Sequence, residues 1–317
     1  MEYDINLIKQ ELIKQIKNSK IQNLEFIDKD KIYIKIGILE TEDNETIKND
    51  IIRFLKLDMK IPKVKYEYDI IKEKLSLENA KKIIISSGKG GVGKSFVTAN
   101  IANVLSKMGY KVAVIDADIY GSSIPMIFDL EDSPQPSGDK IFPLKYENIE
   151  LIGTSNVNPN NEAIVWRGPM LGRLLNSFFR DVCWSEDIDY LLIDLPPGTG
   201  DVPLDLNKLV PDAKCIVVTT PHINASKIAV LAGEIAKMQK HELIGVVENM
   251  SYYLHNEEKL YIFGKSGGEY VAKTLDTTLL EKLPISSPRK STLYSVGEDS
   301  YKMYENVCRQ IKLSFEK

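Results

Sequence analysis

Residues 81–95 read KKIIISSGKGGVGKS, a short apolar run followed at once by a glycine-rich turn and then by a helical pattern from Ser95. The turn fits the spacing GxxxxGK[ST], in which backbone N–H groups curl around phosphate oxygens and the next helix N-terminus adds positive potential. The motif assigns Lys94 to the β- and γ-phosphates of a nucleotide and the Ser95 hydroxyl to magnesium. The predicted nucleotide-binding loop therefore consists of Gly88, Lys89, Gly90, Gly91, Val92, Gly93, Lys94 and Ser95.

Further apolar runs follow this loop, and helical patterns separate them. They include KVAVIDAD, DYLLIDLPP, AKCIVVTTP and LIGVVENM. Continuous Ile, Val and Leu are typical of strands buried on both faces, and helices between them imply a parallel sheet covered on both sides. The sequence therefore predicts an α/β fold with a doubly wound, mostly parallel sheet. In such sheets ligands bind beyond the carboxyl ends of the strands.

Carboxylates follow two of these runs directly. Asp116 and Asp118 end the run VAVIDAD. Two carboxylates two residues apart on a strand face the same side and repel each other unless a cation or water separates them. Asp194 ends the buried run YLLID, the position of an aspartate that holds magnesium through water. Ser95 and Asp194 are therefore predicted magnesium ligands.

Glycine use changes near residue 80. The first 80 residues hold one glycine and one proline, whereas the other 18 glycines and 13 prolines follow. Because glycine allows sharp turns and close approach to a ligand, we expect the ligand chemistry after residue 80. Periodicity before that point predicts an α-β-β-α-β order, with helices over 5–16 and 44–57 and strands over 32–38 and near 64–68. We expect a small N-terminal α+β domain at 1–78 and the nucleotide-binding domain at 79–317.

Composition is that of an ordinary globular protein. The 317 residues are 43% hydrophobic and 27% charged, with a net charge of −4, so no global basic field favours nucleic acid or anionic lipid. The N-terminus lacks the cationic start of a signal peptide, and no run approaches the roughly 18 apolar residues of a membrane span. Three well-separated cysteines argue against disulfides. We expect a cytoplasmic protein with no nucleic-acid partner and no membrane span.

Several further motifs carry a resemblance to a known family. Lys89 adds a second lysine to the loop, and the chain also contains YGSSIP (120–125), WRGPM (166–170), PPGTGD (196–201) and ENMSY (248–252). From about Lys81 to its end, the sequence resembles the Mrp (ApbC-like) branch of MinD/ParA-type P-loop ATPases, whose members are iron–sulfur cluster carriers. The first 78 residues look like a degenerate version of the small domain that often precedes this ATPase.

The resemblance implies a slow ATP hydrolase that uses ATP and Mg²⁺ and works as a homodimer. In the family pattern Lys89 reaches across the dimer to the partner's nucleotide, and Asp118 orients or activates the attacking water. Asp116 supports the magnesium shell, and Asn249 reads the edge of adenine. Catalysis would then rest on Lys89, Lys94 and Asp118, mostly through positioning and charge neutralisation. The implied partners are client apo-iron–sulfur proteins or assembly factors.

The sequence departs from the family where the cluster would bind. Members usually carry CxxC shortly after ENMS, and two copies in a dimer ligate a bridging cluster, but residues 251–264 contain no cysteine. Thiolates are the soft ligands that iron–sulfur clusters need, and His255 is expected to be a solvated loop histidine. Cys215 is expected in the core, and Cys183 and Cys308 as small buried hydrophobes. The sequence therefore predicts little stably bound cluster.

Two other functions stay open on the sequence. A MinD/ParA-like positioning ATPase would need a membrane-binding C-terminal helix or a basic DNA-binding face. Met303, Val307 and Ile311 do have helical spacing, but a core-packing helix explains that spacing equally well. A nucleotide-binding scaffold without a cluster would bind ATP without turnover. The preferred function is an ATP-dependent switch of the iron–sulfur carrier type.

Overall fold

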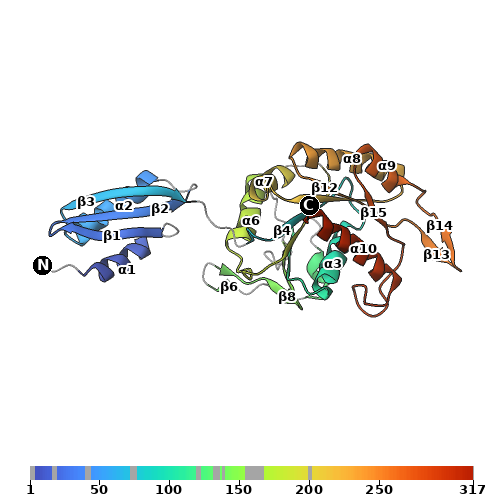
Figure 1. Cartoon of the computed structure of the whole chain (residues 1–317), viewed down its shortest axis with the longest axis horizontal. Coiled ribbons are helices and arrows are strands. Elements are labelled where there is room, and N and C mark those ends of the chain that lie inside the picture. Colours follow the sequence, from blue (N-terminus) through green and yellow to red (C-terminus); the bar gives the residue numbers. More distant parts are fainter. Residues whose placement is uncertain are drawn as a thin grey trace. The chain divides into compact units, whose positions relative to one another are not determined.

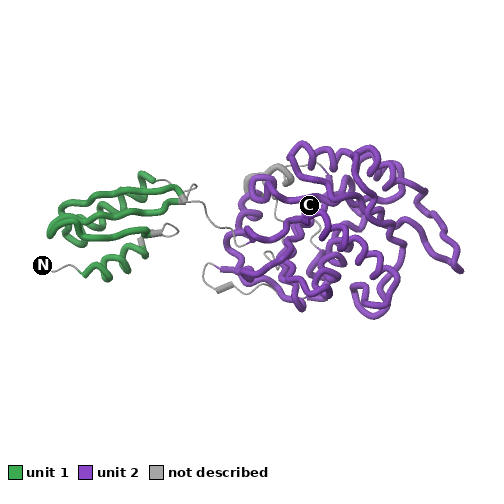
Figure 2. Tube along the Cα trace, in the orientation of Figure 1, with its two compact units in different colours: residues 1–74 green, residues 75–317 purple. Residues whose placement is uncertain are grey.

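The computed structural model of the chain describes residues 4–15, 20–39, 44–71, 77–118, 123–130, 136–137, 140–153, 168–198 and 202–316. Its contacts divide the chain into two compact units, Met1–Lys74 and Leu75–Lys317 (Figure 2). A separate cluster of buried side chains lies within the first unit, and two such clusters lie within the second.

The first unit has the predicted α-β-β-α-β order. Its central strand, β2, pairs antiparallel with β1 and parallel with β3 (Figure 1). Ile32, Ile34, Ile36 and Ile38 are fully buried, because the two-residue period of a strand puts all four on the same face. The elements are α1 (Ile5–Gln15), β1 (Lys20–Asp28), β2 (Lys31–Leu39), α2 (Asn44–Arg53), the π-helical segment η1 (Phe54–Asp58) and β3 (Lys63–Ile71).

The second predicted helix of this unit differs from the prediction in its helix type. The helix expected over residues 44–57 is α-helical only to Arg53 and continues as the π-helical turn η1. Phe54 and Leu55 of this turn are both buried in the core of the first unit.

The second unit has the predicted doubly wound sheet. Within the described residues, eight strands form this sheet in the order β15-β12-β11-β4-β10-β5-β9-β8 (Figure 1). Every pairing is parallel except that of β8 with β9. The apolar runs quoted above form five of its strands. The bounds are β4 (Lys81–Ser87), β5 (Val112–Asp116), β8 (Leu144–Tyr146), β9 (Ile149–Gly153), β10 (Tyr190–Asp194), β11 (Lys214–Thr219), β12 (Leu243–Glu248) and β15 (Leu279–Lys282).

Helices cover both faces of this sheet. Ile83 and Ile85 of β4 pack in the cluster that contains α3, α4 and α10, whereas Ile84 packs in the cluster that contains α6, α7, α8 and α9. Burial on both faces explains why these strands are continuously apolar. The helices are α3 (Lys94–Lys107), α4 (Ile124–Ile127), α6 (Gly168–Arg180), α7 (Val202–Leu209), α8 (Ile223–Met238), α9 (Gly267–Thr274) and α10 (Asp299–Ser314).

Two short strand pairs lie outside the main sheet. One is β6 (Pro136–Ser137) with β7 (Lys140–Ile141), and the other is the hairpin β13 (Tyr253–His255) with β14 (Glu258–Leu260). The hairpin projects from the body of the second unit (Figure 1).

The last helix, α10, packs into the core. Tyr304, Val307, Cys308 and Ile311 are at most 1% exposed, and their apolar face lies in the same cluster as α3. The apolar spacing of this helix is therefore explained by packing within the unit. None of the described helices is long and apolar enough to cross a membrane.

The boundary between the units lies slightly before the predicted one between residues 78 and 79. Leu77 is 1% exposed and, with Ala80, belongs to the core cluster that contains Ile84 of β4. A cut after residue 78 would therefore remove an apolar side chain from the second unit. That the two units fold independently stays a prediction.

We expect a protein shortened to residues 75–317 to fold and bind nucleotide, because its core clusters are complete. A protein shortened to residues 79–317 should be less stable by about 1.5–3 kcal/mol, the value of one buried leucine side chain. Urea unfolding of the two proteins measures this difference. Equal stabilities would show that Leu77 contributes no burial, and loss of both proteins to aggregation would show that the units depend on each other.

His241 is a buried titratable group in the second unit. It is 3% exposed, and its Nδ1 lies 2.8 Å from the Ala213 carbonyl, so that Nδ1 carries the proton. Its Nε2 has no hydrogen-bond partner among the described residues. Burial lowers the pKa of His241 below its ordinary value of 6.5. The folded protein therefore holds this histidine neutral at pH values where the unfolded chain already binds a proton.

Stability should consequently fall as the pH drops below about 6.5, because the unfolded state then binds more protons than the folded state. The contribution of neutral, buried His241 to the free energy of unfolding is complete above pH 6.5 and is lost progressively as the pH falls below that value. His241→Gln should show a shallower loss than the unaltered protein when urea unfolding is compared between pH 7.5 and pH 5.5. His222 and His255 are exposed, and both are present in the variant and in the unaltered protein, so their contribution to the pH dependence is the same in the two. Identical pH profiles for the two proteins would contradict the role of His241.

Candidate functional site

The glycine-rich loop lies between β4 and α3 at the carboxyl edge of the sheet, as predicted. Gly91 and Gly93 have φ values of 78° and 81°, a left-handed conformation that side chains other than glycine adopt at a cost. Gly88 is required for a different reason, since a Cβ there would lie 2.3 Å from the backbone carbon of Ile228 in α8. The loop can form only because its glycines fit these positions.

A cavity of about 360 Å³ opens above this loop. Lys94 lines it from the first turn of α3, Asp118 from the segment after β5, and Pro197 from the segment after β10. Parallel strands end at the same edge, which is why segments far apart in sequence meet here. Lys89 also lines the cavity, and its side chain is exposed.

Asp194 organises the floor of this cavity. It is fully buried, and its Oδ2 lies 2.6 Å from Lys94 Nζ. Ser95 Oγ donates a hydrogen bond to Oδ2 at 2.6 Å, and Thr98 Oγ1 donates one to Oδ1 at 2.7 Å. The first turn of α3 thus surrounds the carboxylate that ends β10. Thr98 was not predicted, although it follows Lys94 by one helical turn and so lies on the same face.

The Lys94 ammonium balances the charge of Asp194 but keeps open donors. It is 5% exposed, and among the described residues no acceptor meets hydrogen-bond geometry with its Nζ. A buried ammonium with unused N–H donors is costly unless an acceptor is supplied. A phosphate oxygen in the adjoining cavity would be such an acceptor.

Asp116 lies beside Asp194, since the two residues are direct partners in the pairing of β5 with β10. Its carboxylate accepts the backbone N–H groups of Asp118 at 3.1 Å, Ser123 at 2.9 Å and Ile124 at 3.1 Å. Burial, followed by repulsion from Asp194, raises the pKa of Asp116 to about 7. Two buried carboxylates held this close favour a cation between them.

The donor set here suits magnesium. Ser95, Asp116 and Asp194 offer only oxygen atoms, which Mg²⁺ prefers, and Mg²⁺ normally takes its remaining ligands from water and phosphate. In the described residues no group of three or more His, Cys, Asp or Glu could hold a metal ion by itself. The residues therefore fit a magnesium ion that binds together with a nucleotide.

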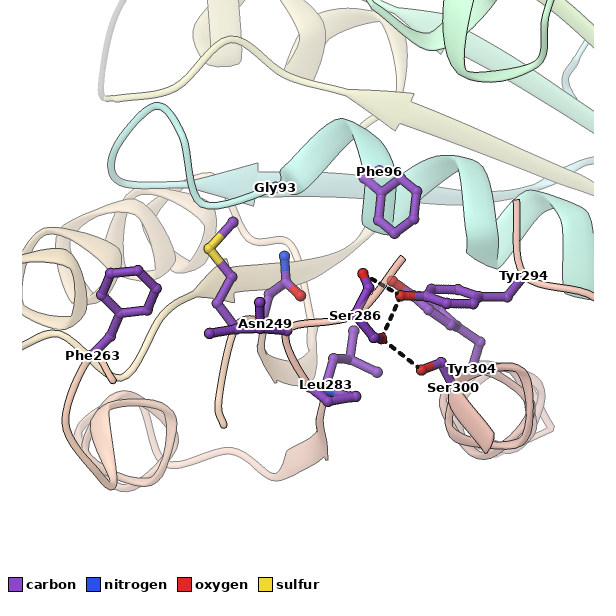
Figure 3. A pocket seen from close by; sticks show the side chains of 12 residues that line it. Gly93, Phe96, Asn249, Phe263, Leu283, Ser286, Tyr294, Ser300 and Tyr304 are labelled. Carbon is purple, nitrogen blue, oxygen red and sulfur yellow. Dashed lines mark hydrogen bonds between the residues drawn. The ribbon is translucent and has the colours of Figure 1, made fainter. Parts of the chain in front are cut away.

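A second cavity, of about 340 Å³, joins the first at Gly93 and Phe96, which line both. Aromatic and aliphatic side chains line most of it, and Asn249 and Ser286 lie between Phe263 and Tyr294 in the view of Figure 3. The ring of Phe96 meets that of Tyr294 edge to face at a centroid distance of 5.6 Å. We refer to this space as the base cavity, because its flat apolar walls and few polar groups suit a planar heterocycle.

Asn249 is fixed at the junction of the two cavities. Its Nδ2 donates to the Val92 carbonyl at 2.9 Å, and a Cβ on Gly93 would lie 2.3 Å from that nitrogen. Its backbone N–H donates to the Thr219 carbonyl at 2.8 Å, which anchors the end of β12 to β11. The side chain therefore spans the phosphate-binding loop and the base cavity.

A small hydrogen-bonded network lies on the Tyr294 side of the base cavity. Ser286 Oγ lies 2.7 Å from the Tyr294 hydroxyl and 3.1 Å from Ser300 Oγ (Figure 3). Asn100 and Asn103 of α3 hold the backbone of Tyr294 at 3.0 Å each. These residues were not predicted, because they follow no motif and lie far from the loop in sequence. The only local signal was Leu283-Pro284, directly after a strand.

The structure brings the predicted site residues together. Those of residues 88–95, with Asp116, Asp118, Asp194 and Asn249, all lie at the carboxyl edge of the sheet. Their individual roles remain predictions. Parts of three motifs, residues 120–122, 166–167 and 199–201, lie outside the described residues.

The cysteines lie apart from this site. Cys215 and Cys308 are fully buried, and Cys308 Sγ donates to the Ile101 carbonyl at 3.7 Å. Burial raises the pKa of Cys215 to about 12 and also raises that of Cys308, so neither offers a thiolate at neutral pH. Cys183 differs from the expectation, because it is only partly buried. His255 is exposed as expected, but it belongs to strand β13 instead of a loop.

Solved structures share this fold. A nucleotide-binding protein from Archaeoglobus fulgidus in complex with ADP is 30% identical, covers 75% of this chain and 90% of its own, and superposes with a TM-score of 0.57. The cell division ATPase MinD of Pyrococcus furiosus is 21% identical, with 74% of this chain and 99% of its own covered and a TM-score of 0.54. The latter shows likeness of fold alone.

Curated relatives are more similar in sequence. The iron–sulfur cluster carrier protein of Bacillus subtilis is 40% identical over 237 residues, covering 72% of this chain and 67% of the relative. That of Mycobacterium tuberculosis strain H37Rv is 42% identical over 208 residues, 63% of this chain, and the match spans only 54% of the relative. The sequence model of the ParA family, described as NUBPL iron-transfer P-loop NTPase, matches residues 78–311. Since that match spans most of the chain and includes every residue of the two joined cavities, the chain belongs to the ParA family of iron-transfer P-loop NTPases.

Proposed function

We propose that the chain binds ATP with Mg²⁺, hydrolyses the ATP and acts as a homodimeric switch in iron–sulfur cluster delivery. The observation that carries the nucleotide part is the pair of cavities joined at Gly93 and Phe96. One offers a buried ammonium and backbone N–H groups for phosphates, and the other offers aromatic walls and an amide for a base. The cluster-delivery part rests on the family and on the names of the relatives.

Phosphate binding is assigned to Lys94 and the loop amides. Lys94 Nζ lies close to the Asp194 carboxylate, but no acceptor in the described residues meets hydrogen-bond geometry with its N–H donors. Phosphate oxygens would therefore replace Asp194 as its partner. Ser95, Asp194 and Asp116 would hold Mg²⁺, which would neutralise negative charge on the phosphates when bound. The gain of that positive charge would also offset the repulsion from Asp194, which adds to burial in raising the pKa of Asp116.

Base recognition is assigned to Asn249. Its Nδ2 is already committed to Val92, so its Oδ1 remains as the acceptor for an exocyclic amino group. Adenine presents such a donor and guanine a carbonyl oxygen at the corresponding ring position. The geometry therefore supports ATP in preference to GTP.

Hydrolysis is assigned to Asp118 and Lys89. Asp118 is partly exposed and lines the phosphate cavity, where its carboxylate could accept a proton from, or orient, the attacking water. Lys89 is exposed at the edge of the same cavity, which leaves its side chain available to the nucleotide of a partner subunit. Dimerisation would then complete both sites and couple hydrolysis to release of the partner.

Lys94→Ala tests the nucleotide part of the proposal. ATP affinity should fall by about tenfold to a hundredfold, because one or more charge-assisted hydrogen bonds to phosphate are lost. Isothermal calorimetry with Mg-ATP measures the change, and Lys107→Ala is the matched control, at the far end of the same helix and exposed. Unchanged affinity in Lys94→Ala would reject the assigned phosphate site.

Asp118→Asn separates hydrolysis from binding. The variant should bind Mg-ATP within about threefold of the unaltered protein but hydrolyse it some 10²- to 10⁴-fold more slowly, the usual value of a positioned general base. Phosphate release and sedimentation with ATP measure turnover and dimerisation. Asp129→Asn, an exposed position outside the cavity, is the control. Normal turnover in Asp118→Asn would remove Asp118 from the mechanism.

The cluster part of the proposal has its own test. Two of the three cysteines are fully buried with raised pKa values, so we propose that the chain acts in delivery without the CxxC ligands that the family pattern uses. Anaerobic reconstitution with iron and sulfide should leave little stably bound cluster, and the protein with all three cysteines changed to serine should behave the same. A stoichiometric chromophoric cluster that is lost when Cys183 alone is changed would contradict this.

A further inference from the structure

We propose that the groove between the hairpin β13–β14 and helix α10 binds an extended, acidic peptide segment of a partner protein, which adds as a strand to the outer edge of β13. The groove has a volume of about 540 Å³. It is separate from the phosphate cavity, but it shares with the base cavity the wall formed by Pro284, Ile285, Ser286, Tyr294 and Ser300. The proposal goes beyond nucleotide binding and does not depend on the family's cluster chemistry.

The outer edge of β13 has open backbone groups. The hairpin turns through Asn256 and Glu257, whose φ values of 46° and 67° belong to a two-residue turn. In such a hairpin the residues flanking the turn bond to each other, and the next pair, Leu254 with Lys259, points its backbone N–H and C=O groups outward. The edge that Leu254 presents is therefore the one that faces away from β14.

A neighbouring segment begins to pair with this edge and then leaves it. The Ile285 N–H donates to the Tyr252 carbonyl at 2.7 Å, and the Ser251 N–H donates to the Leu283 carbonyl at 2.8 Å. Past Tyr252 no backbone group outside the hairpin bonds to Leu254 in the described part of the chain. The backbone pairing thus ends at Tyr252 and does not reach Leu254, where the groove opens. An added strand could continue the pairing from there.

The walls of the groove suit alternating apolar side chains. Tyr253 and Leu254 line it from the hairpin and are 42% and 53% exposed, and Met303 lines it from α10. An exposed, apolar strand edge is a template for pairing with another chain, and proteins usually cover or charge such an edge. Here the edge borders a groove of about 540 Å³.

The charge around the groove favours an acidic occupant. Three cations line it, Lys259, Arg289 and Lys302, against the two carboxylates of Glu298 and Asp299, and Asp299 lies 3.5 Å from Lys302. Lys259 lies over the Tyr252 ring at 4.2 Å. Within the described residues neither Lys259 nor Arg289 has a carboxylate partner for its side chain. Carboxylates of a bound segment would complement these two cations.

Selection from a phage-displayed library of short random peptides on the full-length protein tests the proposal. We expect the enriched peptides to alternate apolar residues and to carry Asp or Glu. The best of them, synthesised with a fluorescent label, is then measured by anisotropy. Its affinity should fall about tenfold or more in Leu254→Pro, which removes the outward N–H, and in Arg289→Glu, which reverses the charge.

Leu260→Ala is the matched control, because Leu260 is exposed on the other strand and does not line the groove. Peptide affinity in this variant should stay within about threefold of the unaltered protein. ATP affinity is measured on every variant as the test of folding, since Leu254 and Arg289 lie outside both nucleotide cavities. If the hairpin of Leu254→Pro is disrupted, Arg289→Glu decides alone.

Three results would overturn the proposal. They are the absence of any enriched peptide, enriched peptides whose affinity is the same in Arg289→Glu, and self-association of the unaltered protein that Leu254→Pro abolishes, which would assign the groove to a second copy of this chain. Failure of the unaltered protein to bind ATP would count against the proposed function and would leave the peptide result standing.

Discussion

The buried carboxylate of Asp194 is the interaction on which the site depends. A fully buried carboxylate is costly unless charge and hydrogen bonds compensate it. Compensation comes from one helical turn, since Lys94, Ser95 and Thr98 all reach it from the start of α3. The parallel register of β4 with β10 places that turn over the end of β10. The phosphate-binding loop is therefore held open by the same contacts that keep Asp194 in the core.

The carboxylates of Asp116 and Asp194 lie side by side at the carboxyl edge of the sheet, and Lys94 contacts Asp194. The Asp116 carboxylate accepts hydrogen bonds from the backbone N–H groups of Asp118, Ser123 and Ile124. These bonds tie both ends of the segment after β5 to the strand. The pKa of Asp116 is raised first by burial and then by repulsion from the nearby Asp194 carboxylate. The two carboxylates would favour Mg²⁺, and Mg²⁺ together with Lys94 would in turn favour phosphate.

The base cavity links this centre to a more distant surface. Its far wall, around Ser286 and Tyr294, is also the near wall of the groove beside the hairpin β13–β14. The hairpin follows Asn249 closely in sequence, and Glu248 fixes that junction through bonds to Ser251 and to the backbone of Gly268. The hairpin contains no cysteine, and Tyr253, Leu254 and Leu260 are exposed on it. The proposed peptide would contact the exposed side chains of Tyr253 and Leu254 beside the groove.

Much of the fold could be predicted from the sequence because its signals are local. Continuous apolar runs mark strands buried on both faces, and Gly88 to Ser95 carry the φ values and the spacing that a phosphate-binding turn requires. The order of the elements in the first unit and the positions of Lys94, Asp194 and Asn249 at strand ends follow from the same patterns. Periodicity could not show that the second helix changes to a π-helical turn at Phe54, because both forms bury a similar apolar face.

Only the tertiary structure decided which distant residues meet. Phe96, Phe263 and Tyr294 form the base cavity from three separate segments, and Thr98 joins Asp194 across 96 positions of sequence. Leu77 belongs to the second unit because its side chain packs there, although no motif marks the boundary. Likewise, the open edge at Leu254 exists because the segment after Ile285 turns away from it. Such contacts depend on the order of the strands in the sheet and on the paths of the loops. Neither can be predicted from the residues next to one another in the sequence. The sequence by itself determined the elements and the phosphate chemistry, whereas packing in three dimensions determined the partners of each side chain.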